Sequence, residues 1–521
     1  MSPSAPLSRR RLLERAAWLA GAALVPAAGC VSARPRLGAD PFTLGVASGE
    51  PALDGMVLWT KLAPRPFELA GGMPPEPVRV RWTVAEDDAF ARVVRRGAAV
   101  ATPEAGHAVH VEVDGLQPGR PYWYRFEADG ELSPVGRTRT TPAVGAPVER
   151  LRLAFGSCQK YETGHFGAYA HMVGDAPDLV LFLGDYIYEQ DPGGAGAIRL
   201  HPNPEPKDLA GYRVRYAAYK SDPMLRAAHA AAPWMVIWDD HEVENDYRGD
   251  RDQDDGDPAA FLLRRAAAYQ AYYEHLPLRR RSRPVGPAMQ LYRSLDWGSL
   301  AQFQFVDDRQ YRGLRPCRAP GSGRGKLIPD CPERRDPARS LLGTAQETWL
   351  LDTLGRSRAQ WNVLAQQTLF GGAEFRDPAA PAAPAYSSDG WDGAPASRAR
   401  ILQRWREAKV ANPVALGGDI HAFAAGDLRE RPDAPVLGTE FVGGSISSLG
   451  TDADGARRMT ALNPHVRFFD GSLRGYGLVD IAPARTDVVF RALADARQPS
   501  TSVRDLARFT VESGRPGVHP A

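Results

Sequence analysis

Four stretches of the chain share one pattern, a short apolar run that leads directly into side chains able to bind metal ions. The runs read LRLAFG, LVLFLG, MVIW and VALGG, and each is typical of a buried strand. The side chains that follow them are Cys158, Asp185, Tyr188, Asp239, Asp240, His241, Asp419 and His421. Because groups beyond the carboxyl ends of strands meet in one crevice of an open α/β sheet, the pattern predicts a metal-dependent hydrolase.

The length and charge of the chain limit the alternatives. With 521 residues it exceeds the usual size of one hydrophobic core, so we expect two domains or one large domain with insertions. Its formal net charge of +2 provides no general attraction to nucleic acid or to an acidic surface. We therefore expect no nucleic-acid-binding patch, and any anion site must be local.

Residues 1–40 are typical of a targeting and processing region, which we exclude from the fold. SRRRLL resembles the twin-arginine export signal, and the apolar stretch after it is shorter than the roughly 20 residues of a membrane-spanning helix. The sequence thus predicts export by the twin-arginine translocation machinery to the periplasm or beyond, with no transmembrane helix in the mature protein. Lipid anchoring at Cys30, in AAGC, is a weaker alternative.

The remaining cysteines differ in their setting. Cys317 and Cys331 share one loop rich in Pro, Gly and Arg, and a disulfide is the simplest interpretation in an oxidising compartment. Cys158 directly follows an apolar run. It is either a metal ligand or a small buried hydrophobic residue, and both interpretations stay open.

Two regions differ in periodicity. Residues 41–142 alternate apolar and polar positions, as in PVRVRWTVA, and the alternating aromatics of YWYRF resemble a fibronectin type III β-sandwich. Residues 150–521 alternate apolar runs with helical stretches such as AAFLLRRAAAYQAYYEHL, which indicates a layered α/β fold. The final stretch, LARFTVESGRPGVHP, reads either as a helical lid or as a frayed end.

The chemistry of each side chain explains why we consider it a candidate metal ligand or catalytic group. Asp185 follows a glycine at a strand end and can bridge two cations, and the phenolate of Tyr188 suits a ferric ion. Asp239, Asp240 and Glu242 would repel one another unless cations or arginines neutralise them, so a metal is the economical explanation; a solvated acidic turn is the alternative. His241 can contact a bound phosphate or donate a proton to a leaving group.

Other segments offer anion-binding or ligand groups. Arg213 and Arg215, beside Tyr212, are arranged to clamp a phosphate, although solvated helix charges explain the run equally well. Asp419 and His421 are two residues apart, so both point to one side of an extended segment. Gln366 or Gln367 could supply a neutral oxygen ligand, but a role as buried core amides is the simpler interpretation.

The motifs FGSCQ, LGDYIYE, WDDHEVEN, DDRQYR, GGDIHAF and FVGGSISS, in this order, resemble the PhoD-like alkaline phosphatases, a branch of the calcineurin-like metallophosphoesterases. The resemblance covers nearly the whole chain. It implies a four-layer α/β/β/α metallophosphoesterase core preceded by a fibronectin type III-like β-sandwich domain. It also implies hydrolysis of small phosphomonoesters, phosphodiesters or both.

The resemblance further implies a centre of Fe³⁺ and Ca²⁺, with Zn²⁺ or Mn²⁺ as the alternative. Cys158 and a tyrosine, either Tyr188 or Tyr212, would bind iron, and Asp185 would bridge iron and calcium. The other implied metal ligands are Asp239, Asp240, Asp419 and His421. His241 and Arg213 would act in catalysis, and Arg213, Arg215 and His241 in substrate binding. The competing hypothesis is an exported binding protein whose metal domain is degenerate and not catalytic.

Overall fold

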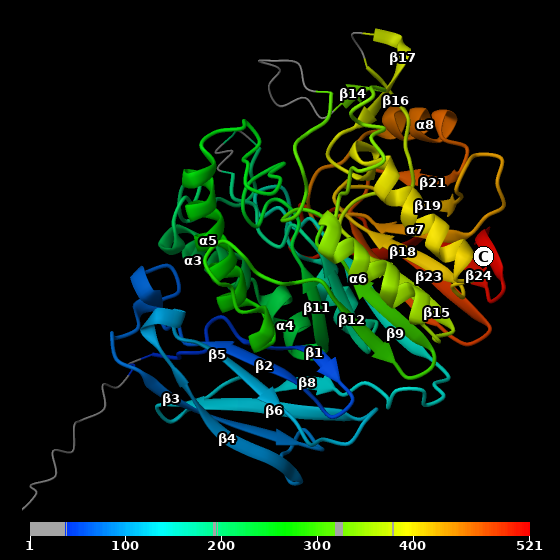
Figure 1. Ribbon diagram of the computed structural model, residues 1–521. Helices are drawn as coiled ribbons and strands as arrows, with labels where there is room; N and C mark the ends of the chain where they lie inside the picture. The colour runs from blue at the N-terminus through cyan, green and yellow to red at the C-terminus, as the bar shows by residue number, and fades with distance from the viewer. Residues whose placement is uncertain (1–36, 38, 191–193, 195, 318–326, 378–379) are drawn as a thin grey trace, which may run out of the picture. The chain divides into compact units, whose positions relative to one another are not determined.

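The computed structural model describes residues 37–521, apart from 38, 191–193, 195, 318–326 and 378–379 (Figure 1). The predicted targeting segment and Cys30 therefore lie outside the described residues. None of the described helices is both long and apolar enough to cross a membrane.

The larger of two main sheets has ten strands in the described part of the chain, in the order β25-β24-β23-β22-β9-β10-β11-β1-β2-β5. Its central strands β9, β10, β11 and β1 are parallel, and antiparallel strands extend it on both sides. The strands are β1 (Val46–Ala52), β2 (Gly55–Lys61), β5 (Ala108–Val113), β9 (Leu151–Gly156), β10 (Leu179–Leu183), β11 (Pro233–Ile237), β22 (Gly475–Ile481), β23 (Arg485–Leu493), β24 (Val503–Glu512) and β25 (Arg515–Pro520).

The second main sheet has seven strands among the described residues, in the order β12-β13-β15-β18-β20-β19-β21. These are β12 (Arg293–Trp297), β13 (Ala301–Phe305), β15 (Trp361–Ala365), β18 (Pro413–Gly417), β19 (Phe423–Leu428), β20 (Gly438–Gly443) and β21 (Val466–Asp470). Aromatic side chains join the two sheets, because Phe490 of the larger sheet packs against Phe423 and Phe441 of the smaller one at ring-centroid distances of 5.1 and 6.4 Å. The main hydrophobic core thus includes residues of both sheets.

Helices pack against each main sheet (Figure 1). Beside the larger sheet lie α2 (Ala168–Gly174), α3 (Leu209–Lys220), α4 (Pro223–Ala231) and α5 (Pro258–His275). Beside the smaller sheet lie α6 (Gly343–Arg356), α7 (Pro395–Glu407) and α8 (Ala453–Leu462). The helices predicted from LAGYRVRYAAYKS and AAFLLRRAAAYQAYYEHL are confirmed as α3 and α5. The mixed sheets with flanking helices confirm the predicted α/β class.

The N-terminal region is rich in strands, as predicted, and it shares a sheet with the α/β region. Strand β1 pairs in parallel with β11, with Ser48 opposite Pro233 and Gly49 opposite Trp234. A Cβ atom at Gly49 would lie 2.7 Å from the carbonyl oxygen of Trp234 in β11, so this close pairing requires glycine. The remaining strands of the region are β3 (Val78–Ala85), β4 (Val93–Ala101), β6 (Pro121–Ala128), β7 (Glu131–Leu132) and β8 (Gly136–Arg139).

Short elements complete the described fold. They are β14 (Leu327–Pro329), β16 (Phe375–Asp377), β17 (Ala380–Ser387), and the 3₁₀ helices η1 (Leu69–Gly72), η2 (Pro103–Ala105), η3 (Arg280–Ser282) and η4 (Trp391–Gly393). A disulfide joins Cys317 and Cys331, whose Cα atoms are 6.0 Å apart.

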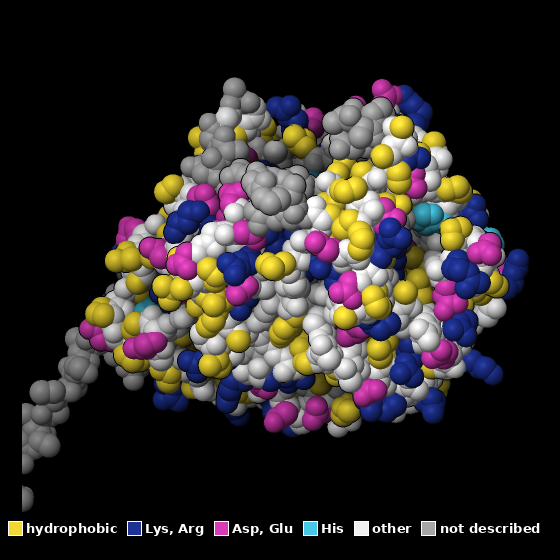
Figure 2. Space-filling model, turned by 45° about the horizontal axis from the view of Figure 1, so that its top comes forward, with side chains coloured by type: hydrophobic (Ala, Val, Ile, Leu, Met, Phe, Trp, Pro, Cys, Tyr) yellow, Lys and Arg dark blue, Asp and Glu magenta, His cyan; other side chains and the backbone are white. Residues whose placement is uncertain are grey.

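The end of the chain differs from both interpretations of its sequence. LARFTVESGRPGVHP forms most of β24 and all of β25 at one edge of the larger sheet, and it is neither a helix nor a frayed end. The Val518 N–H donates to Asp427 Oδ1 at 3.0 Å, which ties this edge to β19. On the face in Figure 2, basic and acidic side chains are interspersed, in keeping with the small net charge.

Candidate metal centre

The four predicted ligand groups follow four strands with the same spacing. Cys158, Asp185, Asp239 and Asp419 each lie two residues beyond the last residue of β9, β10, β11 and β18. Strands β9, β10 and β11 are neighbouring parallel strands, so their carboxyl ends share one edge of the larger sheet. The end of β18 reaches the same place from the smaller sheet.

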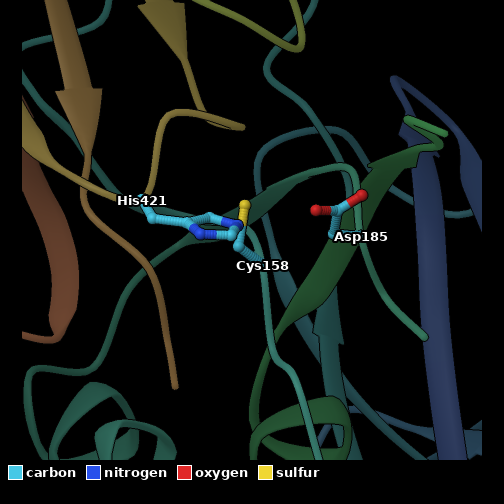
Figure 3. Close-up of side chains that lie close together, drawn as sticks. All are labelled: Cys158, Asp185 and His421. Carbon is cyan, nitrogen blue, oxygen red and sulfur yellow. The ribbon is translucent and has the colours of Figure 1, made fainter. Parts of the chain in front are cut away.

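The side chains at these strand ends form one cluster. Figure 3 shows Cys158, Asp185 and His421 close together, and their ligand atoms lie within 4.8 Å of one another. The same limit holds for three further groups of described residues, which are linked through Asp185 and Asp240. These groups are Asp185, Asp240 and His241; Asp239, Asp240 and Asp419; and Asp240, Asp246 and Asp389.

The backbone turns sharply at the ligand positions. Cys158, Asp185 and Asp419 have φ angles of 59°, 59° and 60°, and φ of His421 is 52°. This left-handed conformation costs about 1–3 kcal/mol for a residue other than glycine, and such strain gathers at functional sites. The turns aim these side chains into the space beyond the strands.

Tyr188 belongs to the cluster. Its hydroxyl donates to Asp185 Oδ2 at 2.7 Å and lies 3.0 Å from His421 Nε2. The hydroxyl of Ser448, in the FVGGSISS segment, donates to the Tyr188 oxygen at 2.8 Å. The phenol oxygen is therefore in position to become a ligand of a cation held by Cys158, Asp185 and His421.

Tyr212, the other tyrosine considered, lies elsewhere. Its hydroxyl donates to the carbonyl of Val243 at 2.5 Å and accepts a hydrogen bond from Arg264 Nε at 2.9 Å. These bonds use its oxygen within the packing of α3 against α5. The structure thus brings Tyr188, and not Tyr212, to the strand ends.

The acidic groups of the cluster are buried at an electrostatic cost. Burial raises the pKa of Asp185 and of Asp239 well above the usual value, and neighbouring carboxylates raise both further. Burial likewise raises the pKa of the Cys158 thiol and of Tyr188. Among the described residues, Asp185 Oδ1 and Asp239 Oδ2 have no hydrogen-bond partner. Unpaired buried oxygens of this kind fit a site that holds cations.

Arg309 provides one fixed positive charge. This arginine of the DDRQYR segment is fully buried, donates from Nε to Asp239 Oδ1, and donates from Nη1 to Asp389 Oδ1 at 2.7 Å. It leaves the second oxygen of Asp239 available. Arg309 therefore compensates part of the negative charge without filling the space between the ligand candidates.

Glu242 connects the ends of two strands. Its carboxylate accepts hydrogen bonds from the backbone N–H groups of Asp185, Tyr186 and Asp239 at 3.1, 2.6 and 2.9 Å. Burial raises its pKa to about 7. Glu242 thus holds the β10 and β11 turns in register and is a backbone anchor.

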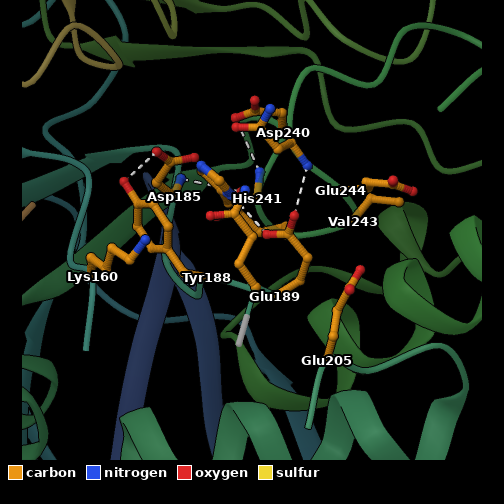
Figure 4. Close-up of polar contacts among 12 residues, drawn as sticks. Lys160, Asp185, Tyr188, Glu189, Glu205, Asp240, His241, Val243 and Glu244 are labelled. Carbon is orange, nitrogen blue, oxygen red and sulfur yellow. Dashed lines mark hydrogen bonds and ion pairs between the residues drawn. The ribbon is translucent and has the colours of Figure 1, made fainter. Parts of the chain in front are cut away.

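His241 is oriented by Glu189 (Figure 4). Its Nδ1 lies 2.7 Å from Glu189 Oε2, and its ring packs against the Tyr188 ring at an interplanar angle of 31° with centroids 4.0 Å apart. Burial alone would lower the pKa of His241, but the carboxylates of Glu189, Asp240 and Asp185 raise it to about 10. Sequence reasoning missed the role of Glu189, although this residue ends the motif LGDYIYE.

The arginines predicted to clamp phosphate are engaged elsewhere. Arg213 forms hydrogen bonds of 2.7 and 2.6 Å to Glu274 of α5. Arg215 is buried and donates to the backbone carbonyls of Tyr188, Glu189 and Asn203. Arg215 thus supports the loop that carries Tyr188, and Arg213 joins two helices.

The two glutamine candidates form local bonds. Gln367 donates to the carbonyl of Val306 at 2.6 Å, and Gln366 donates to the carbonyl of Thr368 at 2.5 Å. Both side chains are fully buried. They serve as core amides, the simpler of the two interpretations.

Comparison with known proteins agrees with this geometry. Residues 153–490 match the family model of the PhoD-like phosphatase, and residues 29–142 match the model of the PhoD-like phosphatase N-terminal domain. The chain belongs to the PhoD-like phosphatase family. It is therefore a phosphoric ester hydrolase, which confirms the family and the enzyme class predicted from the sequence.

Individual members of this family are similar over most of the chain. Alkaline phosphatase D of Bacillus subtilis (strain 168) is 44% identical over 526 residues, which span 98% of this chain and 88% of that protein. A solved structure described as "Structure of PhoD" matches with a TM-score of 0.88 and 45% identity, covering 93% of this chain and 92% of that one.

Arg309→Met should destabilise the metal-free PhoD-like phosphatase by about 3–5 kcal/mol, because it leaves buried carboxylates without their counter-charge. Urea unfolding of chelator-treated protein measures this loss. Arg309→Lys keeps the charge but loses the planar fork, so its loss should be smaller.

The matched control is Arg508→Met, since Arg508 is ion-paired with Asp505 but its side chain is 58% exposed. The control should lose less than about 1 kcal/mol. A loss for Arg309→Met no larger than for the control would contradict a role of Arg309 in neutralising the cluster.

Proposed function

We propose that this PhoD-like phosphatase is an exported alkaline phosphatase that releases phosphate from small organic esters at an Fe³⁺ and Ca²⁺ centre. The observation that carries the proposal is the joining of a thiol, a phenol, an imidazole and several buried carboxylates at four strand ends. The similarity to alkaline phosphatase D of Bacillus subtilis supports the activity. The completeness of the cluster favours an enzyme over a non-catalytic binding protein.

The ligand atoms fall into two chemical groups. Cys158, Tyr188 and His421 offer sulfur, phenol oxygen and imidazole nitrogen, a set that suits Fe³⁺. Asp239, Asp240 and Asp419 offer only carboxylate oxygens, as Ca²⁺ prefers. Asp185 lies between the groups and would bind both cations. Zn²⁺ or Mn²⁺ is the alternative, and the number of oxygen donors argues against Zn²⁺.

The cations, when bound, would polarise the phosphoryl oxygens and stabilise the charge that develops on them. The chain's own residues supply the proton transfer. Glu189 fixes Nδ1 of His241 and favours the charged ring, so Nε2 also carries a proton. His241 would donate this proton to the leaving oxygen of the ester.

Two further features belong to the proposal. The SRRRLL motif supports export through the twin-arginine machinery, and it lies outside the described residues. The helices beside both main sheets support a four-layer α/β/β/α core. The hydrophobic core of residues 41–142, which includes Tyr122, Tyr124 and Phe126, supports a fibronectin type III-like N-terminal domain.

The function is tested by incubating the exported, purified protein with 4-nitrophenyl phosphate and with bis(4-nitrophenyl) phosphate. We expect turnover of at least one ester, loss of turnover after chelation, and recovery on addition of calcium. Absence of turnover of both esters under every metal condition would overturn the proposal.

Glu189→Gln should lower kcat about 100-fold with little change in KM, because the neutral amide can still accept the hydrogen bond from His241 but no longer supplies the negative charge that favours the charged ring. Steady-state kinetics with the ester that turns over measures the effect. Glu430→Gln, which changes a partly exposed glutamate paired with Arg406, should leave kcat unchanged. A wild-type kcat for Glu189→Gln would contradict the role of Glu189 in keeping His241 charged for catalysis.

Cys158→Ala should reduce bound iron at least about tenfold while calcium remains bound, because it removes the thiolate ligand. Elemental analysis of the purified protein measures both metals. Cys158→Ser should show an intermediate loss, since a hydroxyl can still donate an oxygen. Unchanged iron in Cys158→Ala would rule out this ligand, and wild-type protein with zinc or manganese in place of iron would favour the alternative metals.

A further inference from the structure

Three arginines in the described part of the chain that could be considered as a clamp for the substrate phosphate already have partners in the protein. Arg213 is bonded to Glu274, Arg215 to backbone carbonyls, and Arg309 to Asp239 and Asp389. A phosphomonoester nevertheless brings nearly two negative charges to a site that is already acidic. A side chain that supplies positive charge on the solvent side of the cluster would offset this repulsion.

Lys160 has a backbone fixed beside the cluster. It lies two residues after Cys158, and its N–H donates to Ser448 Oγ at 3.2 Å. Its carbonyl accepts a hydrogen bond from Ser447 Oγ at 2.8 Å. Ser448 also bonds the carbonyl of Cys158 and the hydroxyl of Tyr188. The FVGGSISS segment therefore holds Lys160, Cys158 and Tyr188 as one unit, and only the flexible stem of Lys160 is adjustable.

The ammonium group of Lys160 lies over a metal-ligand candidate. Its Nζ is 5.3 Å from the centroid of the Tyr188 ring. Figure 4 shows the Lys160 side chain beside this ring. The hydroxyl of that same ring reaches Asp185 and His421. The side chain is half-buried, and among the described residues no carboxylate forms an ion pair with it. Among the described residues, its charge is therefore not neutralised by a carboxylate of the protein.

We propose that Lys160 binds a non-esterified phosphoryl oxygen of the substrate and thereby favours phosphomonoesters over phosphodiesters. This inference rests on the proposed function. A monoester presents a dianionic phosphoryl group near and above neutral pH, whereas a diester carries one charge and has esterified a second oxygen. The lysine ammonium, a compact point charge on a flexible stem, suits such a contact.

A purely structural role for Lys160 predicts a different result. A cation–π contact with Tyr188 contributes about 0.5–1 kcal/mol at a partly exposed position, and its loss would affect stability or metal binding. Loss of this contact would not change the affinity for a dianionic ligand relative to that for a monoanionic one. Ligand discrimination is therefore the deciding measurement.

The experiment uses the metal-loaded enzyme and two probes, inorganic phosphate and dimethyl phosphate. Calorimetric titration gives the Kd of each probe for the wild type, Lys160→Met and Lys160→Arg. Lys207→Met is the matched control, because Lys207 is a surface lysine whose side chain is 61% exposed. Iron and calcium contents and the Tm of every variant are measured alongside.

For Lys160→Met we expect the Kd of inorganic phosphate to rise about tenfold and that of dimethyl phosphate to change less than about threefold, with metal contents unchanged. Lys160→Arg should recover part of the affinity, and Lys207→Met should match the wild type. Equal changes for both probes, no change, or a change explained by metal loss would each overturn the inference. Turnover assays stay separate, since a wild type that binds phosphate but hydrolyses no ester contradicts the proposed function alone.

Discussion

The burial of several carboxylates where two sheets meet is the constraint on which the rest of this structure depends. Asp185, Asp239 and Asp240 are almost fully buried, and a charged group without a partner is very unfavourable there. Arg309 compensates part of the negative charge at Asp239, and the charge on His241 compensates part of the negative charge at Glu189, Asp240 and Asp185. The oxygens that remain unpaired make cations part of the stable form of the site.

The fold keeps these groups together by backbone bonds from distant parts of the chain. Glu242 holds the turns after β10 and β11, and Ser448 holds Lys160 and Tyr188. The left-handed turns at Cys158, Asp185 and Asp419 are strained conformations that only a well-packed frame maintains. The two packed sheets provide that frame, because the main core runs between them.

The sequence indicated that these side chains meet at one place because Cys158, Asp185, Asp239 and Asp419 each follow their own strand, so the pattern is local. Their role as metal ligands stays a prediction. The sequence could not separate Tyr188 from Tyr212, since the choice depends on which loop faces the strand ends. The sequence also could not predict the hydrogen bonds between Arg213 and Glu274, because these residues lie on different helices. The final strands β24 and β25 were missed since their pairing with β23 is a tertiary contact, and local pattern alone left the segment open.

The same electrostatics connects metal loading to folding. Cations that bind the folded site and not the unfolded chain add their binding free energy to the stability of the fold. The carboxylates of the cluster come from segments far apart in the sequence, so the site exists only once both sheets have formed. A protein of this kind gains from completing its fold and its metal centre before it crosses a membrane. The proposed twin-arginine route, which carries folded proteins, meets that physical requirement.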